Sequence, residues 1–307
     1  MQAHVPVLRA EALQTLSPRP GESVLDCTLG LGGHAVAFLE ATSPDGRLIG
    51  LDADAGNLAA AGKNLGRFAT RIDLQNRNFR DVAEVPGVPV GIVFADLGVS
   101  SPHFDDPERG FSFRKSGDSP SPLDMRYDRS RGQSAAELLI TSSVEDIARM
   151  FREFGELQRS KHLAEVLHLH FHAETRPLHD WKTDDVVGCV EKVFTYRAPG
   201  VLPQVFQALR IAVNDELGAL RFLLDALPSI LLRGGRAGII SYHSLEDRMV
   251  KQAFRTMTTP VLNDVTGQVS VAAPFELLTK KAVSPSAQEL AENPRSRSAK
   301  FRAIRKL

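Results

Sequence analysis

Glycines and carboxylates near the start of the chain lie where an apolar strand gives way to a helix. Val24-Leu25 leads into Asp26, and Gly30-Leu31-Gly32-Gly33-His34 precedes apolar residues at helical spacing. Such glycines permit positive φ and a close approach of the backbone to a ligand. A second apolar run ends in Asp52, which is placed to accept hydrogen bonds from both hydroxyls of a ribose. The pattern predicts a site for a nucleoside cofactor, and a mere tight turn is the alternative.

Two features favour S-adenosylmethionine over NAD as that cofactor. The glycines fall as Gly30-x-Gly32-Gly33, without the G-x-G-x-x-G spacing of a dinucleotide site. A carboxylate such as Asp26 suits a ligand that carries an ammonium and a sulfonium better than one that carries a pyrophosphate. The alternative for Asp26 is an N-cap or a turn acceptor.

Asp96 and His243 are the catalytic candidates, because each follows an apolar run at the edge of the sheet where open parallel sheets bind ligands. Methyl transfer to an exocyclic amine needs acceptors for the N–H groups and an in-line approach. Asp96 and the loop after it can provide both, although the loop is not the Asp/Asn-Pro-Pro-aromatic turn of amino-methyltransferases. The alternatives are an N-cap role for Asp96 and a structural turn role for His243. Ser244 with Asp247 predicts a capping box, since adjacent residues cannot form a Ser-His-Asp triad.

Charge and composition limit the class of partner. The 307 residues include 37 Lys and Arg and 37 Asp and Glu, so a polyanion must be met by a local patch. One patch is the C-terminal stretch 293–307, with six basic and no acidic residues, and the other is an arginine- and aromatic-rich loop at 109–131. An exposed basic tail that binds no RNA is the alternative. The RNA-binding candidates are Arg109, Arg114, Arg126, Arg295, Arg297 and Lys300.

Other residue types point to a cytoplasmic protein without a metal. Cys27 and Cys189 are far apart in sequence, which fits a reducing compartment. The start of the chain has no signal-peptide pattern, and no segment approaches the length of a membrane span. His168 and His172 share a helix face, but no acid or cysteine pattern completes a metal site. We therefore expect no metal, no membrane and a cytoplasmic location.

Strand and helix patterns alternate along the chain, which predicts a parallel sheet covered by helices on both faces. The gap between the fourth and fifth strands is too long for one crossover and predicts an inserted helical domain. Gly234-Gly235 is expected to end a long helix before the fifth strand. We predict a methyltransferase domain at 1–106 and 205–307 and an insert at 107–204. The expected strands are 24–28, 47–51, 72–75, 91–97 and 236–242, with weaker ones at 276–279 and 300–304.

These segments together resemble the RsmH family, formerly MraW, of bacterial 16S rRNA (cytosine-N4)-methyltransferases. Ordered matches run along nearly the whole chain, whereas the helices from about 135 to 200 resemble the family only in layout. The matching segments are 4–8, 26–34, 50–52, 96–101, 109–113, 122–126, 206–210, 242–248 and 293–300.

The resemblance implies a seven-stranded, Rossmann-like class I S-adenosylmethionine-dependent methyltransferase with an inserted all-helical domain. By motif match, Gly32, Gly33 and His34 would line the methionine end of the cofactor. Asp52 would hold its ribose, and Phe79 its adenine. Asp96 would lie at the reactive end, and His103, at a position where the family usually has glutamine, would also contact the cofactor. The stretch 117–121 also departs from the shorter family pattern and leaves the substrate side less defined.

The implied reaction is methylation of the N4 amine of a cytidine in the decoding centre of 16S rRNA, near the P site. The partner would be 16S rRNA, within the small ribosomal subunit, and a homodimer stays open. Three alternatives remain: methylation of another rRNA base or of DNA, a non-catalytic rRNA-binding assembly factor, and a nicotinamide-dependent reductase.

Overall fold

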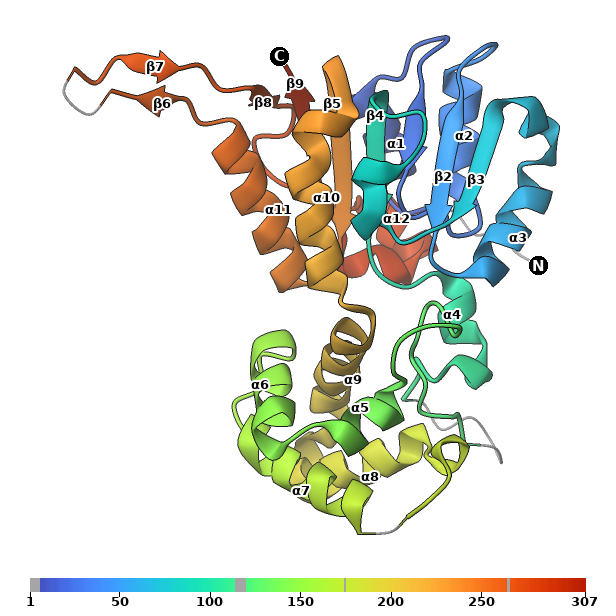
Figure 1. Cartoon of the computed structure of the whole chain (residues 1–307), viewed down its shortest axis with the longest axis vertical. Coiled ribbons are helices and arrows are strands. Elements are labelled where there is room, and N and C mark those ends of the chain that lie inside the picture. Colours follow the sequence, from blue (N-terminus) through green and yellow to red (C-terminus); the bar gives the residue numbers. More distant parts are fainter. Residues whose placement is uncertain (1–5, 114–119, 174, 264–265) are drawn as a thin grey trace. The chain divides into compact units, whose positions relative to one another are not determined.

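The computed structural model describes residues 6–113, 120–173, 175–263 and 266–307 (Figure 1). The chain divides into two compact units, each built around its own core. The first unit comprises Met1–Gly98 and Leu217–Leu307, and the second comprises Val99–Glu216. The insert predicted at 107–204 lies within the second unit.

The first unit is built on the seven-stranded sheet that the sequence predicts (Figure 1). All strands run parallel except β9, which pairs antiparallel with both of its neighbours. The expected class I methyltransferase fold is thereby confirmed. In spatial order the strands are β3 (Ile72–Asn76), β2 (Leu48–Asp52), β1 (Val24–Asp26), β4 (Val90–Asp96), β5 (Leu231–Ser241), β9 (Lys300–Lys306) and β8 (Phe275–Leu277).

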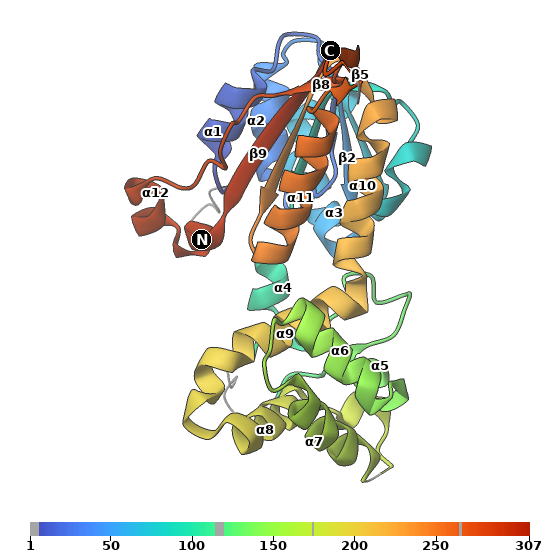
Figure 2. The same cartoon turned by 90° about the vertical axis from the view of Figure 1, so that its left-hand side faces the viewer.

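Helices cover both faces of this sheet because its central strands are apolar on both faces. In β4, Ile92 and Phe94 pack into one core cluster while Val93 and Ala95 pack into the other. The first cluster joins α1, α2 and α3, and the second joins α10 and α11, on the opposite face (Figure 2). These helices are α1 (Arg9–Leu16), α2 (Gly33–Ala41), α3 (Ala55–Asn64), α10 (Glu216–Ile230) and α11 (Ser244–Met257); α12 (Ala287–Glu292) and a separate pair of strands, β6 (Val261–Leu262) and β7 (Val269–Val271), complete the unit.

The second unit is helical in the residues that the structure describes. Its core surrounds Trp181, which is buried and stacks on Phe171 with ring centroids 4.4 Å apart. Ser143 accepts the backbone N–H of Asp146 at 3.1 Å and so caps the start of α6. The helices are α4 (Ser101–Asp105), α5 (Ala135–Thr141), α6 (Val144–Phe154), α7 (Ser160–His172), α8 (Thr183–Phe194) and α9 (Ala198–Asn214).

The prediction for the start of the fifth strand is wrong. Helix α10 ends at Ile230, and β5 begins at Leu231, so Gly234-Gly235 lies inside the strand and does not end the helix. Gly234 has a φ of 78°, and the register between β4 and β5 shifts in this region. Glycine permits this irregularity within a strand. Local sequence propensity instead predicts that two adjacent glycines separate a helix from a strand. Within the described ranges, no helix is long and apolar enough to cross a membrane.

Candidate functional site

The glycine segment between β1 and α2 leaves the start of a helix open to a ligand. Gly32 is the N-cap residue of α2 and has a φ of 84°, a conformation that glycine adopts without strain. Among the described residues no side chain caps α2, so the first N–H groups of the helix have no side-chain acceptor there. An uncapped helix N-terminus attracts a carboxylate.

Gly33 serves packing as well as access. A Cβ atom at this position would lie 2.5 Å from Cγ of Pro6, so a larger residue would displace the N-terminal segment. Gly33 therefore lets the chain around Pro6 close against the start of α2.

Two buried polar atoms beside the glycine segment have no hydrogen-bond partner among the described residues. They are Oδ2 of Asp26 and Nε2 of His34. Oδ1 of Asp26 accepts the backbone N–H of Thr28 at 3.1 Å, so the turn-acceptor alternative explains only one of its two oxygens. Burial raises the pKa of Asp26 to about 6, against the opposing effect of His34. An unsatisfied buried carboxylate oxygen is costly in the free protein and fits a bound ammonium.

Asp52, at the end of β2, is tied to the glycine segment. Its Oδ2 accepts the N–H of Gly30 at 2.8 Å, and its Oδ1 accepts the N–H of Asp54 at 2.8 Å. Nδ2 of Asn57 donates a longer bond of 3.4 Å, which a ligand hydroxyl displaces most readily. Burial raises the pKa of Asp52 to about 7. The carboxylate is thus oriented and still has acceptor capacity.

Phe79 follows β3 at the start of a 3-10 helix, Phe79–Glu84. Its ring is half-buried and packs against one core cluster of the first unit. Asn78 precedes it and accepts the N–H of Arg80 at 2.9 Å, which fixes the turn. A half-buried aromatic ring at this edge of the sheet is suited to contact a planar base.

Asp96 ends β4 and is held by a residue that the sequence analysis missed. The hydroxyl of Tyr242 donates to Oδ1 of Asp96 at 2.8 Å, and Oδ2 of Asp96 lies 3.6 Å from Nε2 of His34. Burial and the neighbouring Asp96 carboxylate raise the pKa of Tyr242 far above its usual range, so the phenol keeps its proton. Ser100, and not Asp96, is the N-cap residue of α4.

His243 occupies the turn after β5, where the predicted capping box is wrong by one residue. His243, not Ser244, is the N-cap of α11, and its partner is Glu246, not Asp247. Oε2 of Glu246 accepts the N–H groups of Tyr242 at 2.8 Å and of His243 at 3.3 Å. Nε2 of His243 lies 3.2 Å from Oε1 of Glu246. His243 thus fixes the turn that presents Tyr242.

The second unit contains three further candidates. His103 is buried among aromatic rings, 5.1 Å from Phe111 and 5.2 Å from Tyr127 between centroids. Arg109 donates to the carbonyl groups of Arg126 and Tyr127 at 2.9 and 3.0 Å. Arg126 forms a two-bond ion pair with the Asp124 carboxylate, which lowers the pKa of Asp124. Both arginines thus shape their own loop, and Arg114 lies outside the described residues.

The C-terminal candidates are exposed. Arg295 and Arg297 lie in a 3-10 helix, Pro294–Ser298, and Lys300 begins β9. Nζ of Lys300 donates to Asp247 at 3.2 Å, so part of its charge is compensated within the protein.

These contacts in the first unit fit a nucleoside that carries an amino-acid group. The open start of α2 suits a carboxylate, and the free oxygen of Asp26 suits an ammonium. Asp52 suits a ribose, and Phe79 suits a base. Asp96 lies at the end of β4, next to β1, and one of its oxygens is held by Tyr242. It can accept a hydrogen bond from an N–H group of a substrate.

Comparisons with known proteins show which family the chain resembles. The model of the MraW methylase family matches residues 1–307. The chain is 43% identical to the ribosomal RNA small subunit methyltransferase H of Symbiobacterium thermophilum, over 99% of this chain and 96% of that protein. It is 44% identical to the protein of the same name from Anaeromyxobacter dehalogenans, over 99% and 98%. The crystal structure of an rRNA methylase from Streptococcus thermophilus is 12% identical, with a TM-score of 0.42 over 99% of each chain, and does not bear on function.

Proposed function

Since the chain belongs to the MraW methylase family, we propose that it methylates the N4 amine of a cytidine in the decoding centre of 16S rRNA, near the P site. The chain is an S-adenosylmethionine-dependent methyltransferase. Its relatives are named ribosomal RNA small subunit methyltransferase H, which supports rRNA of the small subunit as substrate. The observation that supports an amine as the methyl acceptor is the carboxylate of Asp96, which Tyr242 holds beside the proposed cofactor residues. The small subunit as partner and a cytoplasmic location follow from this substrate.

The cofactor would be held along the carboxyl ends of β1 and β2. We assign its methionine ammonium to Asp26 and its carboxylate to the N–H groups at Gly32, Gly33 and His34. Asp52 would accept the ribose hydroxyls, and Phe79 would contact the adenine. The bound cofactor supplies a methyl group activated by its sulfonium.

Asp96 would act on the amine that receives the methyl group. The lone pair of an exocyclic amine is delocalised into the ring, and the nitrogen gains positive charge as it attacks. A carboxylate that accepts a hydrogen bond from the amine N–H orients the nitrogen lone pair toward the methyl carbon and stabilises the developing positive charge. The bond from Tyr242 holds Oδ1, so Oδ2 is the oxygen free to face the amine. His243 would act indirectly, through the turn that carries Tyr242.

The RNA would be held by basic residues of both units. Arg295 and Arg297 are exposed and can contact phosphates. Arg109 and Arg126 would shape the loop that meets the RNA, given their internal bonds. The target base must leave its stack to reach the methyl group.

The direct test is mass mapping of methylated nucleosides in 16S rRNA from cells with and without the gene. Loss of N4-methylcytidine at one site, restored by the wild-type chain, supports the proposal. Loss of a different methylated base, or of none, contradicts it. RNA binding without any consumption of S-adenosylmethionine would favour an assembly factor.

The role of Asp96 is tested by D96A, with D45A as the matched control on an exposed aspartate of the same unit. We expect D96A to abolish methylation and to leave the affinity for S-adenosylhomocysteine within a few-fold. Loss of cofactor affinity with intact residual turnover would contradict this role.

A further inference from the structure

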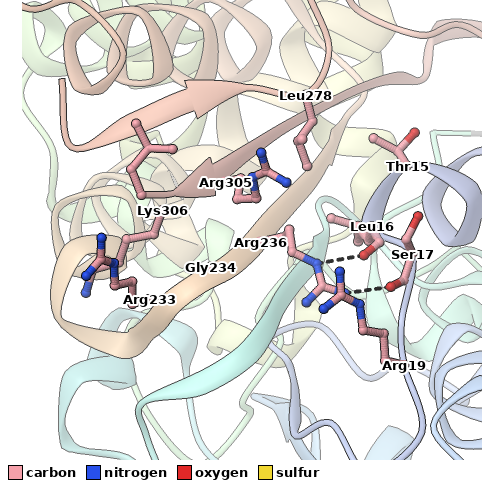
Figure 3. Close-up of a pocket in the computed structure, with 11 residues that line it drawn as sticks. Thr15, Leu16, Ser17, Arg19, Arg233, Gly234, Arg236, Leu278, Arg305 and Lys306 are labelled. Atoms are coloured by element: carbon pink, nitrogen blue, oxygen red, sulfur yellow. Dashed lines mark hydrogen bonds between the residues drawn. The ribbon is translucent and has the colours of Figure 1, made fainter.

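A pocket of about 520 Å³ lies at the end of the sheet opposite the candidate site. It is lined by the end of α1 and the segment after it, by the start of β5 and by the end of β9 (Figure 3). Its volume falls within the range of pockets that bind small molecules and exceeds the needs of a single water or ion.

The lining of this pocket is strongly basic. Of its eleven lining residues, all in the described part of the chain, five are basic and none is acidic. In the whole chain the two signs are balanced, at 37 each. Such a concentration of one sign, within a concave surface, creates a local field that attracts anions. The five are Arg19, Arg233, Arg236, Arg305 and Lys306.

Two of these cations are compensated inside the protein. Arg236 is buried and forms bonds of 2.6 and 2.9 Å with the carboxylate of Glu22, and it also donates to backbone carbonyls at the end of α1 (Figure 3). Arg305 pairs with Glu276. These two arginines build the wall of the pocket.

The charges of the remaining three cations, Arg19, Arg233 and Lys306, are available to a ligand in the pocket. Nζ of Lys306 donates to the carbonyls of Pro228 and Leu231, at 2.7 and 2.8 Å, and neither acceptor neutralises its charge. Arg19 and Arg233 are exposed, and their side chains form no hydrogen bond or ion pair within the described ranges, although the charge of Arg19 helps to lower the pKa of the nearby Glu22. Guanidinium groups in this state bind phosphate through paired N–H bonds.

We propose that this pocket binds backbone phosphates of the substrate rRNA and so anchors the RNA at a second point, remote from the target base. The inference rests on the proposed function for the identity of the RNA. Arg19, Arg233 and Lys306 supply the phosphate contacts, and the volume accommodates a sugar and its two phosphates.

The place of the pocket in the fold makes it an anchor rather than part of the methyl-transfer site. Arg236 and Tyr242 lie six residues apart along β5 and the turn after it, a span of about 20 Å in an extended strand. Both belong to the first unit, so the strand fixes the distance between them. A phosphate contact at that distance positions the RNA without reading its sequence.

The test uses the full-length double variant R19Q/R233Q. Both side chains are exposed, so the fold should be retained, and the melting temperature checks this. The matched control is K251Q/R255Q, which removes two charges from the exposed face of α11. Binding to 16S rRNA in small-subunit particles is measured across a salt series, together with methylation kinetics.

We expect R19Q/R233Q to weaken RNA binding about tenfold at low salt and to lower the salt slope by about one to two. KM for the particles should rise by a similar factor, while kcat and the affinity for S-adenosylhomocysteine stay unchanged. Behaviour equal to that of K251Q/R255Q would overturn the anchor. A change confined to kcat would overturn it as well.

Other anions are distinguished by two further arms. Tripolyphosphate and vesicles of anionic phospholipid are each titrated against the wild type and R19Q/R233Q. Binding of either that depends on the two arginines, with unchanged RNA affinity, would overturn the rRNA assignment. If the wild type fails to methylate the particles, the proposed function fails, whereas the RNA-binding measurement still decides the anchor.

Discussion

At the scale of single residues, the candidate site contains buried groups that are costly to leave unsatisfied and that the proposed cofactor would satisfy. In the part of the chain that the structure describes, one buried oxygen of Asp26 and one buried nitrogen of His34 have no hydrogen-bond partner. Asp52 is better satisfied, because three N–H groups fix its carboxylate. In the proposed complex, Asp26 and His34 would therefore contribute binding energy, and Asp52 would orient the ligand.

The pH dependence of cofactor binding follows from the two raised carboxyl pKa values. Asp52 and Asp26 are buried, with pKa values of about 7 and about 6 against an ordinary 3.8. Their contribution to stability is therefore present below pH 3.8 and is lost as pH rises through 6 and 7, where the buried carboxylates ionise. Ligand hydroxyls and an ammonium need those ionised forms. We expect affinity for S-adenosylhomocysteine to fall about tenfold per pH unit below 7, and more steeply below 6.

Calorimetric titration across this pH range checks the expectation. The variant D52N should bind more weakly and lose the inflection near pH 7. An affinity that does not change between pH 8 and pH 6 would contradict the assigned roles.

Tyr242 is expected to position Asp96. Y242F removes the 2.8 Å bond to Oδ1 and leaves the ring in place. A hydrogen bond to a charged group contributes about 1.5 to 3 kcal/mol, so we expect kcat to fall by at least about tenfold. Affinity for S-adenosylhomocysteine should stay within a few-fold. The control is Y196F, at an exposed tyrosine of the second unit, and equal kinetics of the two variants would refute the role of Tyr242.

At the scale of elements, the turn into α11 shows where local patterns stop being sufficient. Two capping pairs are available in sequence, His243 with Glu246 and Ser244 with Asp247. Arg302 and Lys300 on β9 bond Asp247 at 2.8 and 3.2 Å, so its carboxylate is engaged elsewhere. Contacts between residues more than 50 positions apart thus select the register, and no local rule includes them.

The strand-to-helix transitions at β1 and β2 could be predicted because their signals are local. A continuous apolar run, a glycine at positive φ and an acid at each strand end all fall within short windows. The same local reasoning selected Asp26, Asp52 and Asp96 as candidates. It missed Tyr242, because only pairing of β5 beside β4 brings the phenol to Asp96. A polar-tipped aromatic directly after a buried strand, at the ligand edge, was the available signal.

The start of α2 provides a prediction for a single element. Gly32 has a φ of 84°, and a Cβ atom there would lie 3.2 Å from Cγ of Leu65. We expect G32A to lose about 1 to 2 kcal/mol of unfolding free energy and to weaken S-adenosylhomocysteine binding, since the helix start must shift.

The matched control is Gly62, inside α3, where a Cβ atom meets only ordinary contact with Leu74 at 3.7 Å. G62A should gain about 0.5 to 1 kcal/mol through helix propensity and leave binding unchanged. Urea unfolding with both variants measures the difference. A destabilisation of the same size at both positions would show that Gly32 has no special conformation.

At the scale of the whole molecule, the basic pocket and the proposed cofactor residues lie at opposite ends of the same sheet, on different strands. Sequence reasoning could not find the pocket, because its basic residues lie at 19, 233–236 and 305–306. Each position alone is an ordinary surface cation. Antiparallel pairing of β9 with β5 brings the last two segments together, with Arg236 directly opposite Arg305. The topology of the sheet therefore brings positive charges together, although the chain as a whole has no net charge.

The two units have separate cores, which predicts that the cofactor stabilises one unit selectively. The cluster around Trp181 contains residues of the second unit only, whereas the proposed cofactor residues, apart from His103, belong to the first. Trp181 is the single tryptophan of the chain, and its fluorescence therefore reports on the second unit alone. At a hundredfold excess over Kd, S-adenosylhomocysteine should stabilise the first unit by about 2.7 kcal/mol.

Urea unfolding followed by two probes tests this division. We expect the ligand to shift the far-ultraviolet circular dichroism transition that arises from the sheet unit and to leave the Trp181 fluorescence transition in place. The variant D52N, which binds weakly, should show neither shift. If the ligand shifts both transitions together, the two cores unfold as one cooperative body. A ligand that binds only the first unit can stabilise the surroundings of Trp181 only if the two units are coupled.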